Sequence, residues 1–244
     1  MSKFYPTVAS LLISFIACVL ASKSLYASDI DQAQQLIPFK AEYIAFRFGD
    51  DVGTATLALE HLGYDQYSLT YSSKVSKFFL SDKRYEHSIF SFSDGQITPQ
   101  SYNYTRSGTG PDKALSANFD AASKSIMVDG QKLKDWQGEF DNQLFRIDIP
   151  RQLSRDKKEM RYAFVNYRGQ PREYIIKVVG KEQLDLPYGM VDSVKIKIDR
   201  GSSSRETFAW FSPALDYTLV RLQQFKDGEE QGDIQLKTLV QSPH

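Results

Sequence analysis

The sequence predicts a mainly β protein, an antiparallel sandwich or barrel that carries one short helix. Runs in which apolar and polar residues alternate recur along most of the chain, which is typical of strands with one buried face. Turn sequences rich in Gly, Asp and Pro separate these runs roughly every 8–12 residues. Only one stretch has apolar residues at helical spacing, which is too little helix for a parallel α/β sheet.

The first three strands are predicted in Phe39–Phe48, Val52–Glu60 and Gln66–Val75. In the third run, apolar residues alternate with Ser, Thr and Lys, so one face is expected to be buried and the other to face water. The connections at 49–51 and 62–65 contain Gly and Asp, which tolerate the positive φ angles of hairpin turns. We therefore predict a three-stranded antiparallel meander.

Further strands are predicted on both sides of a single helical stretch. Glu139–Leu153 places Phe140, Leu144 and Ile147 at helical spacing, and Pro150 is expected to end or kink this helix. We expect the helix to pack across an end or a face of the sheet. The remaining predicted strands are Lys83–Phe92, Ile97–Ser107, Lys113–Phe119, Ile126–Val128, Met160–Tyr167, Arg172–Val179, Met190–Arg200, Thr207–Phe211, Thr218–Lys226 and Asp233–Val240.

The first 27 residues read as an export signal. Lys3 supplies a positive charge, Val8–Ala21 is almost continuously apolar, and Ala21 or Ala27 is the expected last residue before cleavage. An uncleaved anchor is the less favoured alternative, because a membrane span needs about 20 apolar residues. No second apolar run follows, so we expect a periplasmic mature chain without an integral membrane span.

Cys18 is the only cysteine of the chain and falls inside this segment. Lipid anchoring at Cys18 is disfavoured, because the apolar run continues past it. The mature chain is then expected to contain no disulfide, no thiolate metal site and no cysteine nucleophile. Basic and acidic residues balance at 30 each, so no basic excess points to nucleic acid.

Four segments carry the order and spacing of features found in a known bacterial family. They are PFKAEYIAFRFGDDVGTATLALE (Pro38–Glu60), KVSKFFLSDKRYEHSIFSF (Lys74–Phe92), DLPYGMVDSVKIKI (Asp185–Ile198) and TFAWFSPALDYTLVRLQQ (Thr207–Gln224). On these segments the chain resembles DUF3108, a family of exported proteins. The family has no established activity, so no catalytic residue follows from the resemblance.

The resemblance implies a fold similar to the periplasmic lipoprotein carriers, which is an analogy of fold and not of function. With the strand pattern, it leads us to expect a curved antiparallel sheet or open β-barrel of about ten to twelve strands with one short helix, plus an N-terminal signal helix. The expected organisation is a signal peptide at 1–27, a lead-in at 28–37 and a single β domain at 38–244.

Groups that usually carry catalysis are scarce. His61, His87 and His244 are the only histidines, and no two have metal-ligand spacing. The nucleophile elbow G-x-S-x-G and a glycine-rich phosphate loop are both absent from the sequence. We therefore predict no catalytic residue, no metal site and no cofactor.

Strand carboxylates leave a hydrolase as a remote alternative. Glu42, Glu86, Glu173 and Glu206 fall inside predicted strands, and a pair of carboxylates facing a cavity can hydrolyse glycosides. In amphipathic strands such residues usually occupy the face exposed to water, and this is the interpretation that we favour.

Two apolar features point to a ligand. Phe78, Phe79 and Leu80 are consecutive large apolar residues flanked by Lys and Arg. They fit either a loop at the mouth of an apolar cavity or a loop that closes the end of the barrel as part of the core. Tyr102 and Tyr104 belong to a set of strand aromatics that fits either a ligand-binding concave sheet or an aromatic core.

We therefore expect a non-catalytic periplasmic binding or carrier-type protein for an apolar ligand, such as a lipid or an acylated chain. The ligand is assigned to the five residues of these two features. The alternatives are a cell-envelope structural or interaction module that binds another protein, and, least favoured, an envelope hydrolase.

Overall fold

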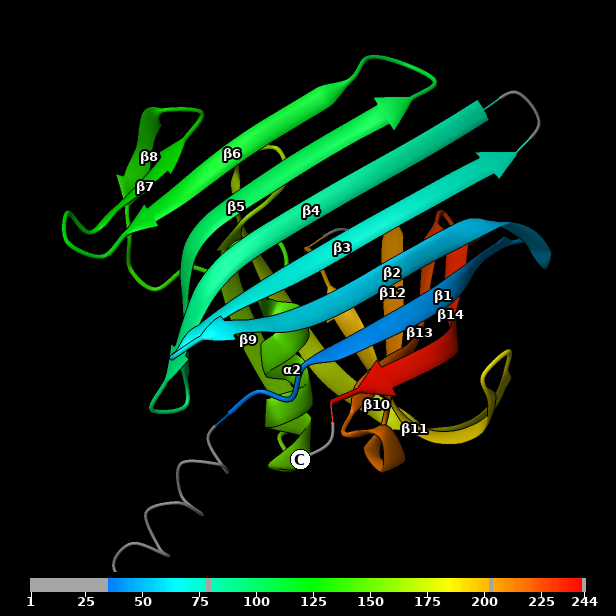
Figure 1. Cartoon of the computed structure of the whole chain (residues 1–244). Helices are drawn as coiled ribbons and strands as arrows, with labels where there is room; N and C mark the ends of the chain where they lie inside the picture. The colour runs from blue at the N-terminus through cyan, green and yellow to red at the C-terminus, as the bar shows by residue number, and fades with distance from the viewer. Residues whose placement is uncertain (1–34, 78–79, 202–203, 243–244) are drawn as a thin grey trace, which may run out of the picture. The chain divides into compact units, whose positions relative to one another are not determined.

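The computed structural model describes residues 35–77, 80–201 and 204–242 (Figure 1). The chain divides into two units, Met1–Leu36 and Ile37–His244. Of the first unit only Gln35 and Leu36 are described, so the predicted signal helix and Cys18 lie outside the described residues. All of the described strands and helices belong to the second unit.

The second unit is built on one antiparallel sheet of fourteen strands. Its order is β8-β7-β6-β5-β4-β3-β2-β1-β14-β13-β12-β11-β10-β9, so the first and last strands of the chain pair in the middle and β8 and β9 form the two edges. The strands are β1 (Phe39–Arg47), β2 (Asp50–Gly63), β3 (Gln66–Lys77), β4 (Leu80–Ser93), β5 (Gln96–Gly108), β6 (Lys113–Asp120), β7 (Ser125–Val128), β8 (Gln131–Asp135), β9 (Glu159–Val165), β10 (Pro171–Leu186), β11 (Gly189–Asp199), β12 (Arg205–Ser212), β13 (Thr218–Lys226) and β14 (Glu229–Gln241).

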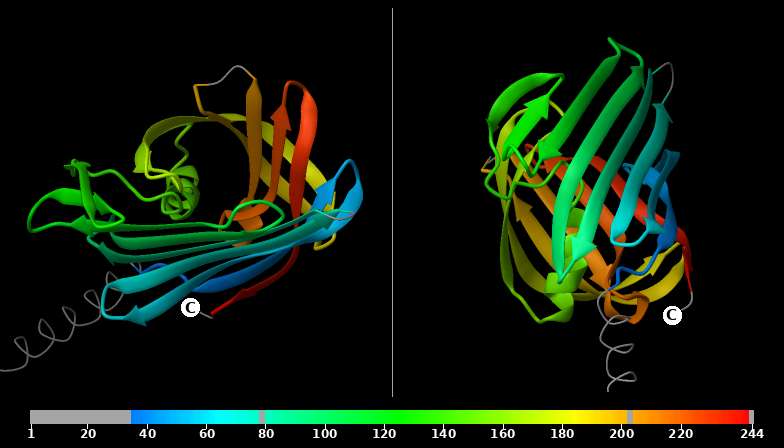
Figure 2. Two further views of the ribbon diagram at one scale, coloured as in Figure 1. Left: turned by 90° about the horizontal axis from the view of Figure 1, so that it is seen from above. Right: turned by 60° about the vertical axis from the view of Figure 1, so that its left-hand side comes forward.

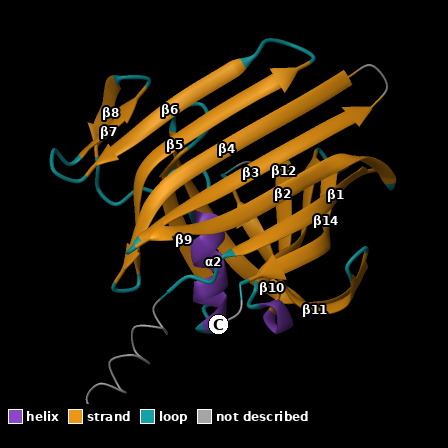
Figure 3. Cartoon of the chain, in the orientation of Figure 1, coloured by secondary structure: helices purple, strands orange, loops and turns teal. Residues whose placement is uncertain are grey.

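The sheet curves around the helix α2 (Phe145–Ser154), as the view from above in Figure 2 shows. The inner face of the sheet is the face turned toward α2. The connection between β8 and β9 carries α2, so it links the two edges of the sheet without pairing them (Figure 3). A short 3₁₀ helix, η1 (Pro213–Leu215), follows β12. The expectation of a curved, open antiparallel sheet with a short helix is confirmed.

The predicted meander is confirmed, because β1, β2 and β3 are consecutive antiparallel neighbours. The expectation of about ten to twelve strands is wrong, since the sheet has fourteen. The strand β8 carries no signal in the sequence, because QKLKD has a single apolar residue and no alternation. It forms because Asp129 and Gly130 both adopt positive φ angles, 49° and 78°, and turn the chain back onto the edge of β7.

Two clusters of apolar core residues consist of side chains in the described ranges. One cluster joins α2 to β9–β12 and contains the fully buried Phe164, Ile176 and Ile196. The other joins β5–β7 to the end of β9 and includes the fully buried Ala117, Ile126 and Val165. Burial alternates along the strands that contribute to them, which is the pattern of a sheet with one filled face and one wet face.

The helix begins later than the predicted Glu139–Leu153. Phe140 does not enter it, because its backbone pairs with β9, where its N–H donates to Ala163 and its carbonyl accepts from Val165. Asp141 then turns the chain, since its Oδ1 accepts the N–H of Gln143 at 2.8 Å and that of Leu144 at 3.1 Å. A tertiary contact therefore sets the start of the helix.

Of the two expected effects of Pro150, an end or a kink of the helix, the first is wrong, because α2 continues to Ser154. Ile149 and Leu153, on either side of the proline, are both buried in the cluster formed with β9–β12. Arg151 also bonds to Asp148 at 2.8 Å within the helix. This packing outweighs the backbone hydrogen bond that proline cannot make.

Polar bonds connect the α2 segment to the other half of the sheet. Gln143 Nε2 donates to the Leu69 carbonyl on β3 at 3.2 Å and to Ser88 Oγ on β4 at 3.0 Å. Arg151 donates to the Gly95 carbonyl at 2.7 Å. The segment therefore contacts both halves of the curved sheet from the inside.

A first prediction concerns Gly53 on β2, where β3 approaches closely. Its φ is +151°, and a Cβ at this position would lie 2.0 Å from the carbonyl oxygen of Lys74. We expect Gly53→Ala to lower the free energy of unfolding by about 1–3 kcal/mol, because the backbone of β3 must shift. Urea titration followed by circular dichroism measures this loss.

Gly180→Ala on β10 is the matched control. A Cβ there would meet no atom within 4 Å. We expect it to change the free energy of unfolding by less than about 1 kcal/mol. Equal losses in the two variants would contradict the close approach of β3 to Gly53.

A second prediction concerns Asp141, which is fully buried and whose Oδ2 has no hydrogen-bond partner among the described residues. Burial raises the pKa of its carboxyl to about 6, although bonds from Gln143, Ser88 and Leu144 oppose the shift. The folded state therefore favours the protonated acid. The contribution of the Asp141 carboxyl to the stability of the folded state is complete below about pH 3.8 and is lost as the pH rises through about 6.

Asp141→Asn keeps the Oδ1 acceptor and removes the ionisation. We expect the unfolding free energy of the variant, minus that of the wild type, to rise by on the order of 2 kcal/mol from about pH 4.5 to about pH 7.5. Urea unfolding of both proteins at the two pH values measures this change. A difference between them that does not depend on pH would show that the carboxyl does not titrate in this range.

Candidate ligand-binding site

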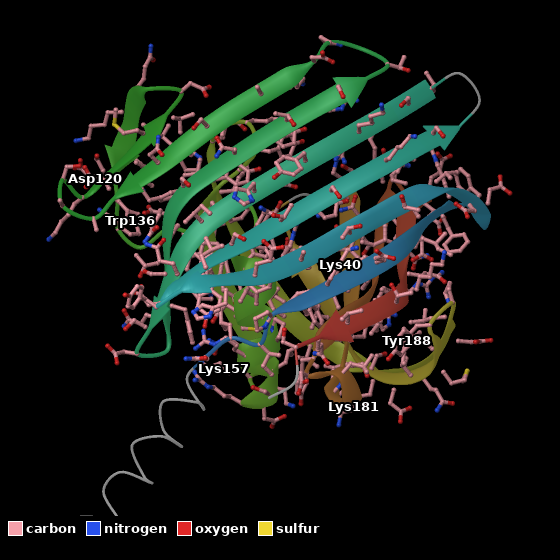
Figure 4. All side chains as sticks on the ribbon, viewed as in Figure 1. Lys40, Asp120, Trp136, Lys157, Lys181 and Tyr188 are labelled. Atoms are coloured by element: carbon pink, nitrogen blue, oxygen red, sulfur yellow. The ribbon has the colours of Figure 1, made fainter. Side chains whose placement is uncertain are left out.

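A cavity of about 730 Å³ lies inside the curved sheet, lined by β1–β5, β10, β12–β14 and the α2 segment. Side chains occupy much of the space between the strands and α2 (Figure 4). The volume of the cavity falls within the roughly 300–1,000 Å³ that is usual for small-molecule sites.

One wall of the cavity is apolar and lies across the junction of β14, β1, β2 and β3. Ala45 pairs with Ile234 of β14 on one side and with Gly53 of β2 on the other, and Gly53 pairs with Val75 of β3. Ala45, Val75 and Ile234 therefore lie in one row across the sheet, and all three line the cavity. Val52 and Ala55 of β2 add to this wall.

The adjacent wall, on β4 and β5, is charged. Arg84 and Arg106 are direct cross-strand partners, and both bond to Asp82, with nitrogen–oxygen distances of 3.0–3.1 Å. Burial raises the pKa of Asp82, but the hydrogen bonds from the two arginines outweigh this effect and lower the pKa below its ordinary value. The carboxylate therefore stays ionised between two guanidinium groups.

A buried polar cluster lies next to this wall. Glu86 is only 5% exposed, and its Oε2 accepts hydrogen bonds from the Tyr102 hydroxyl at 2.8 Å and from Asn142 Nδ2 at 2.6 Å. Arg146 of α2 lies 3.5 Å from Oε1 of the same carboxylate and stacks over Tyr71 at 4.9 Å. Burial and the neighbouring Glu86 raise the pKa of Tyr102 far above its ordinary value.

The structure places the predicted ligand residues in different surroundings. Leu80 is 64% exposed and lines the cavity, whereas Phe78 and Phe79 lie outside the described residues. Tyr102 is fully buried, and Tyr104 is almost so and packs on Tyr167 at a ring distance of 5.2 Å. Neither tyrosine is among the cavity-lining residues. Tyr102 donates a hydrogen bond to Glu86, and Glu86 does line the cavity.

Sequence reasoning missed the arginines of the cavity. Six arginines line it, together with only two acidic residues, Asp82 and Glu86. A signal was present for Arg106, because it shares the alternation of Tyr102 and Tyr104 and so belongs to the inner face of β5. The six arginines are Arg47, Arg84, Arg106, Arg146, Arg200 and Arg205.

The carboxylates weighed as hydrolytic groups do not gather in one place. The side chains of Glu42, Glu173 and Glu206 are 44%, 60% and 45% exposed, as expected for the wet face. The same expectation is wrong for Glu86, which faces inward because the cluster around Tyr102 and Asn142 provides its hydrogen bonds.

The histidines have ordinary surroundings. His61 is exposed and lies 2.7 Å from the Tyr64 carbonyl, and the half-buried His87 lies 2.9 Å from the Thr70 hydroxyl. His244 lies outside the described residues. Across the described ranges, no three His, Cys, Asp or Glu side chains gather as a metal site, and no helix is both long and apolar enough to span a membrane.

Solved structures with related folds include a beta-barrel-like protein of domain DUF1849 from Brucella abortus. It is 9% identical, with a TM-score of 0.54, and the likeness covers 86% of this chain and 99% of that one, so it shows a common fold. A Bacteroides fragilis protein with a YmcC-like fold is 10% identical at a TM-score of 0.33, covering 83% of this chain and 95% of that one. Aeromonas veronii immune modulator A is 8% identical at a TM-score of 0.24, covering 84% and 79%.

Comparison with curated proteins gives no match. Residues 39–235, which run from the first residue of β1 into β14, match the family described as "Protein of unknown function (DUF3108)". This match takes in every element that lines the cavity and most of the chain. The chain therefore belongs to the DUF3108 family.

Proposed function

We propose that this protein is a non-catalytic periplasmic binding or carrier-type protein, and that its cavity holds the apolar part of a lipid or of an acylated chain. The observation that carries the proposal is the cavity of about 730 Å³ inside an open sheet, with apolar side chains of four adjacent strands in one wall. The periplasmic location rests on the export signal expected at 1–27.

The position of the apolar wall supports this function. Ala45, Ala55 and Val75 face inward on three adjacent strands, and their small side chains leave the volume that a larger residue would fill. Removing an alkyl chain from water onto such a wall contributes about 25 cal/mol per Å² of buried apolar surface. Leu80 at the start of β4 adds an apolar side chain to the lining, and the assignment of Phe78 and Phe79 to the mouth of the cavity remains a prediction.

The two alternatives have less support. A module that binds partners by strand addition needs a free sheet edge, whereas β8 carries Lys132 and Lys134 and β9 is paired with Phe140 at Ala163 and Val165. For a hydrolase, Asp82 and Glu86 are the acidic residues at the cavity. Their Cα atoms lie about 13 Å apart on one strand, and each carboxylate is engaged by its own partners, Asp82 by two arginines and Glu86 by a tyrosine and an asparagine, so the two do not form a catalytic pair.

A direct test is to extract the purified full chain with organic solvent and to identify bound molecules by mass spectrometry. We expect a lipid or acylated compound in about one copy per protein or fewer. The variant Asp141→Asn, in which the cavity lining is unchanged, is extracted in the same way as a control. The same compound should be recovered from this independent preparation. Repeated absence of such a compound, together with no uptake of added lipid, would contradict the proposal.

A third prediction uses two alanines on opposite faces of β2. Ala55 lines the cavity and Ala58 lies on the outer face. We expect Ala55→Leu to weaken binding of a fluorescent fatty acid about ten-fold or more, because the new side chain fills space that the ligand needs. Ala58→Leu is the matched control and should bind like the wild type; equal effects of the two changes would place the ligand elsewhere.

A further inference from the structure

We propose that the cavity selects amphiphiles with an anionic headgroup, a phosphate or a carboxylate, and that its arginines hold this headgroup. The inference rests on the proposed function, because it takes the apolar wall as the site of the chain. It adds the chemical class of the ligand, which the apolar wall alone does not define.

The first observation is the charge of the lining. Six of the twelve arginines of the sequence line the cavity, whereas none of the lysines with described side chains does. Two carboxylates oppose them, so the lining carries a net charge of +4 (six minus two) in a chain whose formal net charge is zero. Such a concentration of one sign inside low-dielectric walls attracts anions.

The second observation is that two arginines are placed against each other. Arg84 and Arg106 are directly opposite on β4 and β5, and like charges at such positions destabilise a sheet. Asp82 bonds to both, but one carboxylate neutralises only one of the two charges. A second anion between the guanidinium groups would complete the neutralisation.

The third observation is that Arg47, Arg200 and Arg205 have no carboxylate within 4 Å in the described part of the chain. Nε of Arg200 is buried and donates to no acceptor among these residues. Its guanidinium stacks on Tyr174, with the carbon 5.3 Å from the ring centre. Stacking occupies the flat face of a guanidinium and leaves its N–H edge free for a ligand.

The fourth observation is the arrangement of the two walls. One row of cross-strand neighbours contains Ile234 of β14, Ala45 of β1, Val75 of β3 and Asp82 of β4. This row therefore runs from apolar residues to a charged one. A molecule lying across these rows meets an apolar surface on one side and arginines on the other. Arginine binds phosphate and carboxylate through two parallel N–H donors, which suits both headgroups.

The test measures binding of chemically defined probes to the full chain by titration calorimetry at low salt, below the micelle concentration of each probe. The probes share a dodecyl or lauroyl chain: dodecyl phosphate, laurate, dodecyl maltoside and dodecyltrimethylammonium. Inorganic phosphate tests the headgroup without a chain. We expect the two anionic probes to bind at least ten-fold more tightly than the neutral and cationic ones, and added salt to weaken the anionic probes only.

The variants are chosen so that loss of binding is separated from loss of the fold. Arg205→Gln changes an exposed residue at the start of β12, and Arg106→Gln changes the charged wall itself. We expect each to weaken dodecyl phosphate about ten-fold. Arg172→Gln, on the exposed part of β10 and outside the cavity, is the control and should leave binding unchanged; thermal unfolding of each variant confirms its fold.

The outcomes distinguish this inference from the proposed function. If the neutral probe binds as tightly as the anionic probes and the arginine changes have no effect, the anion site is overturned while the apolar site stands. If only inorganic phosphate binds, and Arg106→Gln weakens it, the anion site stands and the site for a chain falls. If no probe binds, both are overturned.

Discussion

The pairing of β1 with β14 is the contact on which the rest of this structure depends. Each half of the chain is a meander that would leave its inner face open to water by itself. Pairing along Phe39–Phe46 joins the two meanders into one curved sheet, with Ala41 opposite Leu239 and Ala45 opposite Ile234. The apolar wall of the cavity lies across this junction, so the same contact completes both the sheet and the candidate site.

The inner face is not uniformly apolar, and the exceptions are concentrated at the cavity. Around α2 the face is filled by the aromatic and aliphatic clusters, where Phe145, Phe164 and Tyr174 pack ring against ring. On β4 and β5, three of the inward positions are instead taken by Arg84, Glu86 and Arg106. Charged residues at inward strand positions depart from the usual alternation of apolar and polar residues, and burying charge without partners is costly. Natural sequences show such departures mainly at functional sites.

The fold was largely predictable from the sequence because its signals are local. The alternation in β3 and the Gly and Asp turns around it depend only on neighbouring residues. The start of α2 was not predictable, because the pairing of Phe140 with β9 decides it. The strand β8 was missed for a similar reason, since its residues form a strand only where the edge of β7 is available.

The candidate site was less predictable than the fold. Leu80, which was assigned to a ligand because it belongs to an apolar run in the sequence, lines the cavity, while its contact with a ligand remains a prediction. The charged lining was not found, because Arg47, Arg146 and Arg205 come from three distant parts of the chain and meet only when the sheet curves. No local pattern distinguishes these arginines from solvated surface residues.

The place of β14 in the middle of the sheet also bears on how the polypeptide acquires its structure. Because β14 (Glu229–Gln241) is translated after the other thirteen strands, one row of backbone N–H and C=O groups on β1 stays unpaired until those strands have been made. Sheets dominated by contacts between residues far apart in sequence have a high contact order and fold slowly. The open edge of β1 is therefore the region most exposed to misassociation before β14 docks.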